Sequence, residues 1–134
     1  MNTETYLAVP YVDGSRDIAV GFDCWGMVRH VLHHEFGLPL LESFGGINRN
    51  VPVMMTKGFE QSSPDFQECA PKAGAVACCF YRGNDVDVFH HVGVCISDSD
   101  VLHTSSNKGP YVSSIRAFKR LAYVVKFFEY VGKK

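Results

Sequence analysis

The 134-residue chain has no excess of charge of one sign, because 13 Lys and Arg residues nearly balance 14 Asp and Glu residues. It therefore lacks the basic composition that captures nucleic acids or anionic membranes, and we expect neither as a partner. No apolar run approaches the roughly 18 residues that a membrane span needs. Internal repeats and low-complexity tracts are also missing. These absences leave one globular domain over residues 1–134, an ordinary domain length.

The start of the chain lacks a basic segment followed by an apolar one, which is the pattern of a secretory signal peptide. We therefore expect the chain to be made and kept in the cytoplasm, where reducing conditions keep cysteines as thiols. The five cysteines cannot all pair within one chain, since their number is odd. Beside six histidines, they are candidates for metal ligands, nucleophiles or small core residues.

The pattern of apolar residues predicts helices first and hairpin-connected strands second. Asp23 is a favourable N-cap, and apolar residues then recur with helical spacing until Gly37 and Pro39 end the helix. A second, short helix is expected near residues 52–61. Strands are expected at residues 75–81, 91–96, 101–104 and 121–130, with a polar loop before the last one. This order predicts an α+β domain with an antiparallel sheet.

One cysteine and two histidines have the pattern of a covalent catalyst. Cys24 lies at the first turn of the predicted helix, where unpaired backbone N–H groups and the helix dipole favour a thiolate. His91 and His103 lie on successive predicted strands, and they can be neighbours if those strands are antiparallel. A nucleophile, a base and a third group that orients the base are the general parts of covalent catalysis. We therefore predict a triad of Cys24, His91 and His103.

The chain resembles the NlpC-type cell-wall peptidases, which belong to the papain-like superfamily, in five segments that occur in the same order. The nucleophile motif is similar to Gly21-Phe22-Asp23-Cys24-Trp25-Gly26-Met27-Val28, and the base motif to His91-Val92-Gly93-Val94. The segment with the third polar residue is similar to Val101-Leu102-His103-Thr104. The start of the central strand resembles Pro71-Lys72-Ala73-Gly74, and the upstream segment with an active-site tyrosine resembles Pro10-Tyr11-Val12-Asp13-Gly14.

This resemblance implies a papain-like fold in which the helix bearing the cysteine packs on a central antiparallel sheet. It implies a thiol peptidase that hydrolyses an amide bond in peptidoglycan stem peptides, a murein endopeptidase that needs no metal and no cofactor. Cys24 would be the nucleophile, His91 the base and His103 the residue that orients His91. The backbone N–H of Cys24, together with Tyr11, would form the oxyanion hole.

Trp25 makes the chain more similar to the phage-tail branch of this family. That branch implies a tail-tip or tail-assembly component, with other tail proteins as partners and a location in the virion or as a prophage product. Two alternatives stay open: a non-enzymatic assembly protein that keeps the peptidase fold, and an amidase or acyltransferase that acts on another substrate. A third alternative is a zinc-binding module that uses a subset of Cys69, Cys78, Cys79, His90 and His91.

Adjacent residues of a strand point to opposite faces, so Cys78 and Cys79 cannot chelate one ion together. For the same reason only one of His90 and His91 can reach the predicted nucleophile. We expect His91 to do so, and His90 to be exposed. His30 and His34 have the spacing of a helical metal pair, but we expect them to lie on a solvated helix face.

Overall fold

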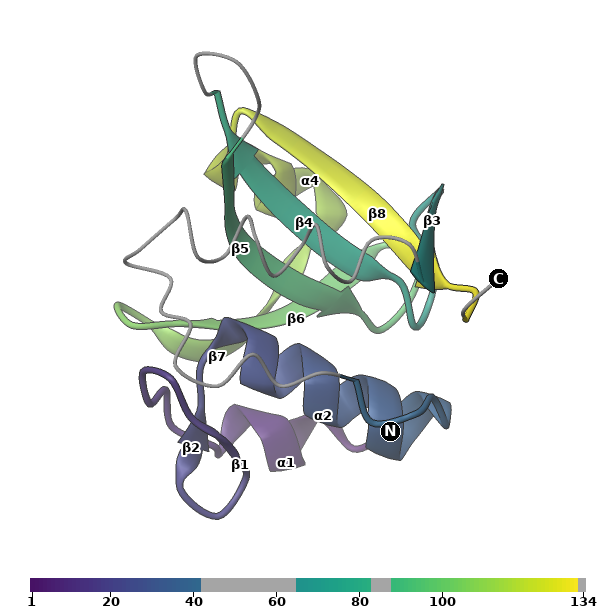
Figure 1. Cartoon of the computed structure of the whole chain (residues 1–134). Coiled ribbons are helices and arrows are strands. Elements are labelled where there is room, and N and C mark those ends of the chain that lie inside the picture. The colour runs from purple at the N-terminus through teal and green to yellow at the C-terminus, as the bar shows by residue number, and fades with distance from the viewer. Residues whose placement is uncertain (42–64, 83–87, 133–134) are drawn as a thin grey trace.

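A helical layer and a β-sheet make up the molecule (Figure 1). The computed structural model describes residues 1–41, 65–82 and 88–132, so the helix predicted near residues 52–61 lies outside the described residues. The first range contains α1 (Thr3–Leu7), β1 (Arg16–Asp17), β2 (Gly21–Phe22) and α2 (Cys24–Phe36). The other ranges contain β3 (Phe66–Cys69), β4 (Val76–Tyr81), β5 (Val88–Cys95), β6 (Asp100–Ser105), β7 (Gly109–Ser114), α4 (Ile115–Phe118), a 3₁₀ turn (Lys119–Leu121) and β8 (Val124–Tyr130).

Six strands form one antiparallel sheet in the order β3-β8-β4-β5-β6-β7. Strands β4, β5, β6 and β7 are neighbours in both sequence and space, while β8 returns to pair with β4 on one side and β3 on the other. The short strands β1 and β2 form a separate ladder just before α2. The predicted α+β class with an antiparallel sheet is therefore confirmed.

Helix α2 begins and ends where its local sequence predicts. The Asp23 side chain accepts a hydrogen bond from the backbone N–H of Gly26 at 2.8 Å, which satisfies one of the donors that a helix start leaves unpaired. Gly37 ends the helix with φ of 70°, a left-handed conformation that favours glycine. No helix in the described ranges combines the length and the apolar character that a membrane crossing needs.

Alternate residues of the sheet point into two cores on opposite faces. What we call the larger core contains the buried face of α2 together with Val76, Cys78, Phe80, Val92, Val94 and Leu102 of the sheet. What we call the smaller core contains Ala75, Ala77, Cys79, Cys95, Val101, Phe127 and, from α4, Phe118. Figure 1 shows α2 and α4 on different sides of the sheet. Phe118 is fully buried, and its burial contributes about 2 kcal/mol to holding α4 against the sheet.

The polar loop predicted before the last strand is wrong, because this segment contains β7, α4 and the 3₁₀ turn. β7 pairs with β6 along the whole length of both strands. Its sequence, Gly-Pro-Tyr-Val-Ser-Ser, is rich in turn residues, which explains why it is not predicted as a strand. Ser114 then caps α4 by accepting a hydrogen bond from the backbone N–H of Ala117 at 3.1 Å.

Candidate active site

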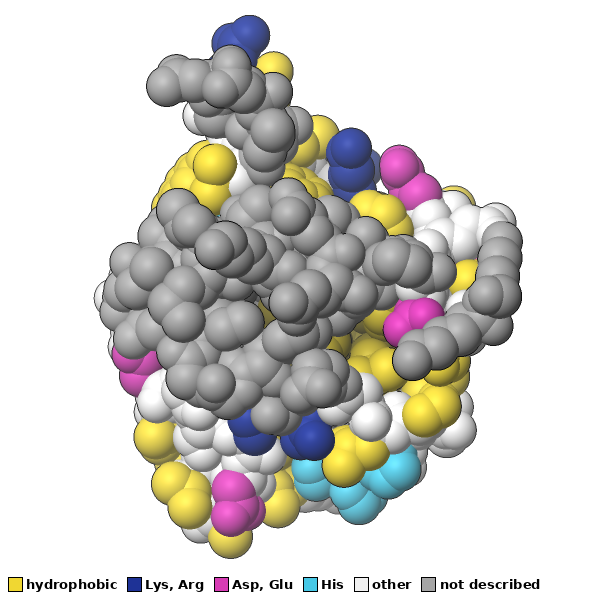
Figure 2. Space-filling model, viewed as in Figure 1, with side chains coloured by type: hydrophobic (Ala, Val, Ile, Leu, Met, Phe, Trp, Pro, Cys, Tyr) yellow, Lys and Arg dark blue, Asp and Glu magenta, His cyan; other side chains and the backbone are white. Residues whose placement is uncertain are grey.

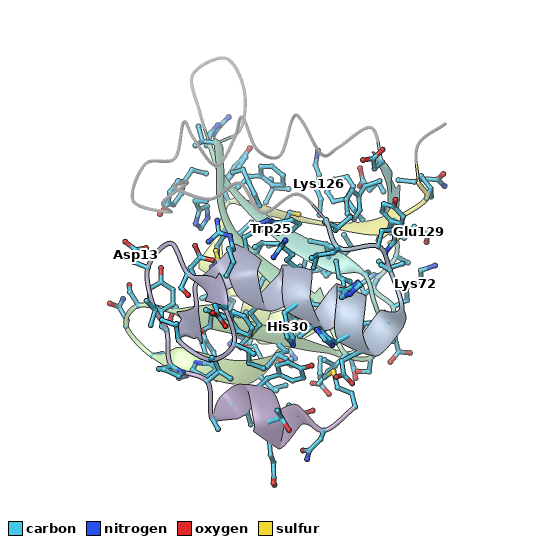
Figure 3. The ribbon with its side chains drawn as sticks, turned by 60° about the horizontal axis from the view of Figure 1, so that its bottom comes forward. Asp13, Trp25, His30, Lys72, Lys126 and Glu129 are labelled. Atoms are coloured by element: carbon cyan, nitrogen blue, oxygen red, sulfur yellow. The ribbon has the colours of Figure 1, made fainter. Side chains whose placement is uncertain are left out.

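Cys24 is the first residue of α2 and is almost completely buried, with 2% of its surface exposed. It belongs to the larger core, between the helix and the sheet. All five cysteines of the chain are free thiols. Figure 3 shows the next residue, Trp25, on the side of α2 that faces the sheet, and His30 on the side that faces α1.

The start of α2 is fastened to the segment around β1. Asp23 forms an ion pair with Arg16, and its backbone N–H donates to the carbonyl oxygen of Ser15 at 3.2 Å. A Cβ atom on Gly26 would lie 2.4 Å from that same carbonyl, so only glycine allows this close approach. Burial raises the pKa of Asp23, and the Arg16 guanidinium opposes that rise by stabilising the carboxylate. These contacts fix the position of the helix end that carries Cys24.

His91 and His103 form a hydrogen-bonded pair inside the protein. His91 Nε2 lies 3.0 Å from His103 Nδ1, and the other ring nitrogen of His103, Nε2, lies 2.9 Å from the hydroxyl oxygen of Ser113. The two histidine residues are 4% and 0% exposed. The Phe118 ring is perpendicular to the His103 ring at a centroid distance of 4.9 Å. The expected proximity of the two histidines is therefore present, and it extends to Ser113.

Gly93 makes room for this pair. A Cβ atom at this position would lie 2.6 Å from Val101 Cγ1 and 3.0 Å from His103 Cβ, both of which are too close for a side chain. The Val-Gly-Val sequence after His91 thus has a steric role, because a side chain on Gly93 would collide with Val101 and His103 of β6.

His103 is neutral in the folded protein over most of the pH range. Burial lowers its pKa to about 4, and the nearby positive charge of Lys108 acts in the same direction. A neutral His103 has one hydrogen on its ring, so it can donate from one ring nitrogen and accept at the other. It can therefore link His91 to Ser113 without carrying a charge.

This lowered pKa predicts a loss of stability in weak acid. Between pH 6.5 and about 4 the unfolded chain protonates His103 while the folded chain does not, so stability falls as the pH falls through this window. The difference corresponds to about 3 kcal/mol at the acid end of the window. Urea unfolding as a function of pH should therefore show a shallower slope for His103→Gln than for the wild type. The exposed His34→Gln is the control, and equal slopes for all three proteins would refute the prediction.

Cys24 belongs to the larger core, whereas the histidine pair lies on the face of the sheet that carries the smaller core. In the β4–β5 ladder His91 lies opposite Cys79, a residue of the smaller core, and its ring centroid is 5.9 Å from that of Phe118. Gly93 and His103 lie on this same face. The structure therefore brings His91 and His103 together, and it places Cys24 in the core on the α2 side of the sheet.

The paired part of β5 and β6 is short, and it ends before it reaches His91 and His103. The ladder consists of Val94 opposite Leu102 and Cys95 opposite Val101. His91 precedes the paired part of β5, and His103 follows the paired part of β6, so both lie at the end of the ladder. A contact between the two sides of the sheet needs an opening of this kind, since paired strands separate their two faces.

The expectation that His90 is exposed is wrong, because 6% of its surface is exposed. The reason is a β-bulge: Cys79 lies opposite His91, but Phe80 lies opposite Phe89, so His90 is the additional residue of β5. Its ring stacks on the Tyr81 ring, with a centroid distance of 3.8 Å and an interplanar angle of 9°. His90 thus has a buried position next to His91 that simple strand alternation does not predict.

Tyr11 lies close to the start of α2, as its predicted role requires. It forms an isolated bridge with Phe22, the residue before the N-cap. Its hydroxyl donates a hydrogen bond to a carboxylate oxygen of Asp13 at 3.0 Å. To donate to an oxyanion instead, the hydroxyl would have to leave Asp13, so its place in an oxyanion hole stays a prediction.

The other cysteines and histidines have identifiable surroundings. Cys78 belongs to the larger core and Cys79 to the smaller one, which confirms that they point to opposite faces. His30 stacks on His34 with a centroid distance of 4.1 Å, and Figure 2 shows a histidine patch on the surface in this part of the molecule. Within residues 1–41, 65–82 and 88–132, no group of three or more His, Cys, Asp or Glu is arranged to hold a metal ion.

Comparisons with known proteins leave the family open, because no protein-family model and no curated protein matches the chain.

Two residues of the site, Ser113 and Arg16, are missing from the sequence prediction. Tyr111 and Ser113 have the period-two spacing of a strand, which could have placed Ser113 on the same face as Tyr111. No sequence pattern of this kind indicates Arg16, because only the folded loop brings its side chain next to Asp23.

Proposed function

We propose that the chain is a thiol peptidase with a papain-like, NlpC-type fold that hydrolyses an amide bond in peptidoglycan stem peptides. The observation that carries the proposal is the chain of hydrogen bonds from the buried His91 through the buried His103 to the half-buried Ser113, on a sheet covered by a helix that begins with a cysteine. A buried pair of imidazoles is costly unless its nitrogens are hydrogen-bonded. In the proposal, a hydrogen bond from His91 Nε2–H to His103 would stabilise the imidazolium that forms when His91 accepts a proton.

The proposal gives the two ring nitrogens of His91 different tasks. Nε2 lies within hydrogen-bond distance of His103 Nδ1, and the proposal assigns Nδ1 to exchange a proton with Cys24. The proposal requires the Cys24 thiol and His91 Nδ1 to meet at the end of the β5–β6 ladder, beyond the Val94–Leu102 pair. His103 would keep the His91 ring in the orientation that this transfer needs.

The reaction then follows from these assignments. The Cys24 thiol gives its proton to His91 Nδ1, and the sulfur attacks the carbonyl carbon of the substrate amide. The carbon–nitrogen bond breaks, and His91 returns the proton to the leaving amine. Water, deprotonated by His91, cleaves the resulting thioester, which releases a carboxylic acid and restores the thiol. Backbone N–H groups at the start of α2, including that of Cys24, would stabilise the oxyanion.

We also propose that the protein is a component of a phage tail, on the strength of the resemblance around Trp25. A protein of this kind would act in the virion or as a prophage product, beside other tail proteins. Its substrate would then be the host cell wall, reached as part of a larger particle.

Digestion of defined peptides tests the proposed function. The purified protein is incubated with isolated cell-wall sacculi and with synthetic stem peptides, and the products are identified by mass spectrometry. We expect cleavage at one amide bond, with one oxygen atom from isotopically labelled water in the new carboxyl group. Intact peptides would overturn the proposal. Transfer of the acyl group to an added amine, without hydrolysis, would replace it with an acyltransferase.

A further inference from the structure

We propose that Ser113 is a positioning residue of this site: its hydroxyl accepts the hydrogen of His103 Nε2 and so keeps His91 Nδ1 ready to take the proton of Cys24. The inference rests on the proposed function, which it deepens by adding a fourth group behind the two histidines. Ser113 lies on β7, and its hydroxyl oxygen is 2.9 Å from His103 Nε2.

The direction of each hydrogen bond follows from the state of His91. Once His91 has taken the thiol proton, both of its ring nitrogens carry hydrogen, so its Nε2–H must donate to His103 Nδ1. A neutral His103 that accepts at Nδ1 carries its own hydrogen on Nε2. Among the described residues, the hydroxyl oxygen of Ser113 lies within hydrogen-bond distance of that nitrogen and can accept from it.

Without this acceptor the pair would favour the opposite arrangement. The buried Nε2–H of His103 would have no partner in Ser113, and an unsatisfied buried donor is unfavourable. The hydrogen would then shift to Nδ1 of His103, which donates to His91 Nε2. Neutral His91 would carry its hydrogen on Nδ1, and it could not accept the proton of Cys24 there.

The ring of His103 cannot turn away easily to find another acceptor. Tyr111 of β7 lies against it with a centroid distance of 4.0 Å, and Phe118 of α4 lies against it at 4.9 Å. These ring contacts hold the plane of the His103 ring. The tautomer of His103 is therefore set by the groups at its two ring nitrogens, His91 and Ser113.

A matched pair of variants tests the inference. Ser113→Thr keeps the hydroxyl group. Ser113→Val has nearly the shape of the threonine variant without the hydroxyl, and its methyl groups occupy the space in which a water molecule could take the place of the serine hydroxyl. We expect Ser113→Val to lower kcat by about 10- to 100-fold with little change in KM, and Ser113→Thr to stay near the wild type. Nitrogen-15 NMR of the histidine rings should show hydrogen on Nε2 of His103 in the wild type and in Ser113→Thr, and on Nδ1 in Ser113→Val.

The two readouts separate the inference from the proposed function. A wild-type protein without hydrolase activity would remove the proposed function, whereas the ring tautomers would still report on Ser113. Equal tautomers in Ser113→Thr and Ser113→Val overturn the positioning role, whether or not activity changes. A loss of activity accompanied by a lower unfolding temperature and an unchanged tautomer would show that Ser113 is only structural.

Discussion

Replacing Cys24 with alanine is expected to reduce peptide hydrolysis to the level of buffer, a loss of about 10⁴-fold or more. The reason is that the proposed reaction passes through a bond to this sulfur. Cys78 and Cys95 do not offer an equivalent, because burial raises the pKa of Cys78 well above its ordinary value and that of Cys95 to about 12. The variant should remain folded, since removal of one buried sulfur costs only about 1 kcal/mol. Rates on a defined stem peptide, measured beside the thermal unfolding curve, check both expectations.

Cys69→Ala is the matched control for this prediction. Cys69 is a half-buried cysteine on edge strand β3, and burial together with Glu129 raises its pKa. Its replacement should leave the rate unchanged, and we expect iodoacetamide to inactivate this variant and the wild type alike. Full activity in Cys24→Ala would exclude the thiol mechanism.

Normal particle assembly with Cys24→Ala, combined with impaired host entry, would distinguish wall cleavage from a purely structural role in the tail.

The parts of the fold that the sequence predicts correctly depend on short stretches of chain. Helix α2 is predicted with its N-cap Asp23 and its C-terminal Gly37, because capping residues and the helical period act within a few residues of each other. The approach of His91 and His103 is predicted from two consecutive strands joined by a turn, which are antiparallel when they pair. Local chemistry is sufficient in both cases.

The parts that the sequence misses depend on partners far away along the chain. β7 has too many turn residues to be predicted alone, and it exists because β6 supplies its hydrogen bonds and its register. The α4 segment is too short to predict, and it is fixed by the burial of Phe118 in the smaller core. Ser113 is missed together with β7, because the period-two spacing of Tyr111 and Ser113 is a weak signal without the pairing that β6 supplies.

The burial of His90 shows how sensitive a catalytic assignment on a strand is to register. A shift of one residue moves every side chain to the other face of a sheet. The bulge in β5, where Phe80 lies opposite Phe89 and Cys79 opposite His91, causes such a shift within the strand. As a result, Val92 and Val94 face α2, while His91 faces Phe118. No pattern in residues 88–95 specifies this bulge, because it arises from the pairing with β4. The two adjacent histidines therefore need an experimental comparison.

Replacing His91 with alanine is expected to lower kcat/KM by about 10³- to 10⁴-fold, because the reaction loses the group that accepts and returns the proton. His90→Ala is the matched control from the neighbouring position. It should keep the rate within about threefold of the wild type, and lose about 1 kcal/mol of stability with the stacking on Tyr81. The pH dependence of Cys24 alkylation gives a second measurement: the reaction near neutral pH should slow in His91→Ala and remain in His90→Ala.

The reverse result would assign the site differently. If His90→Ala loses activity and His91→Ala keeps it, the base is His90, and the chain from His91 to Ser113 serves the stability of the smaller core. Loss of activity in both variants, with normal unfolding curves, would mean that the stacked His90 holds His91 in place through the bulge. The two residues are adjacent and both are buried, so their replacement should affect the stability of the core to a similar extent. A difference in activity between the two variants therefore reports on the direction in which each imidazole points.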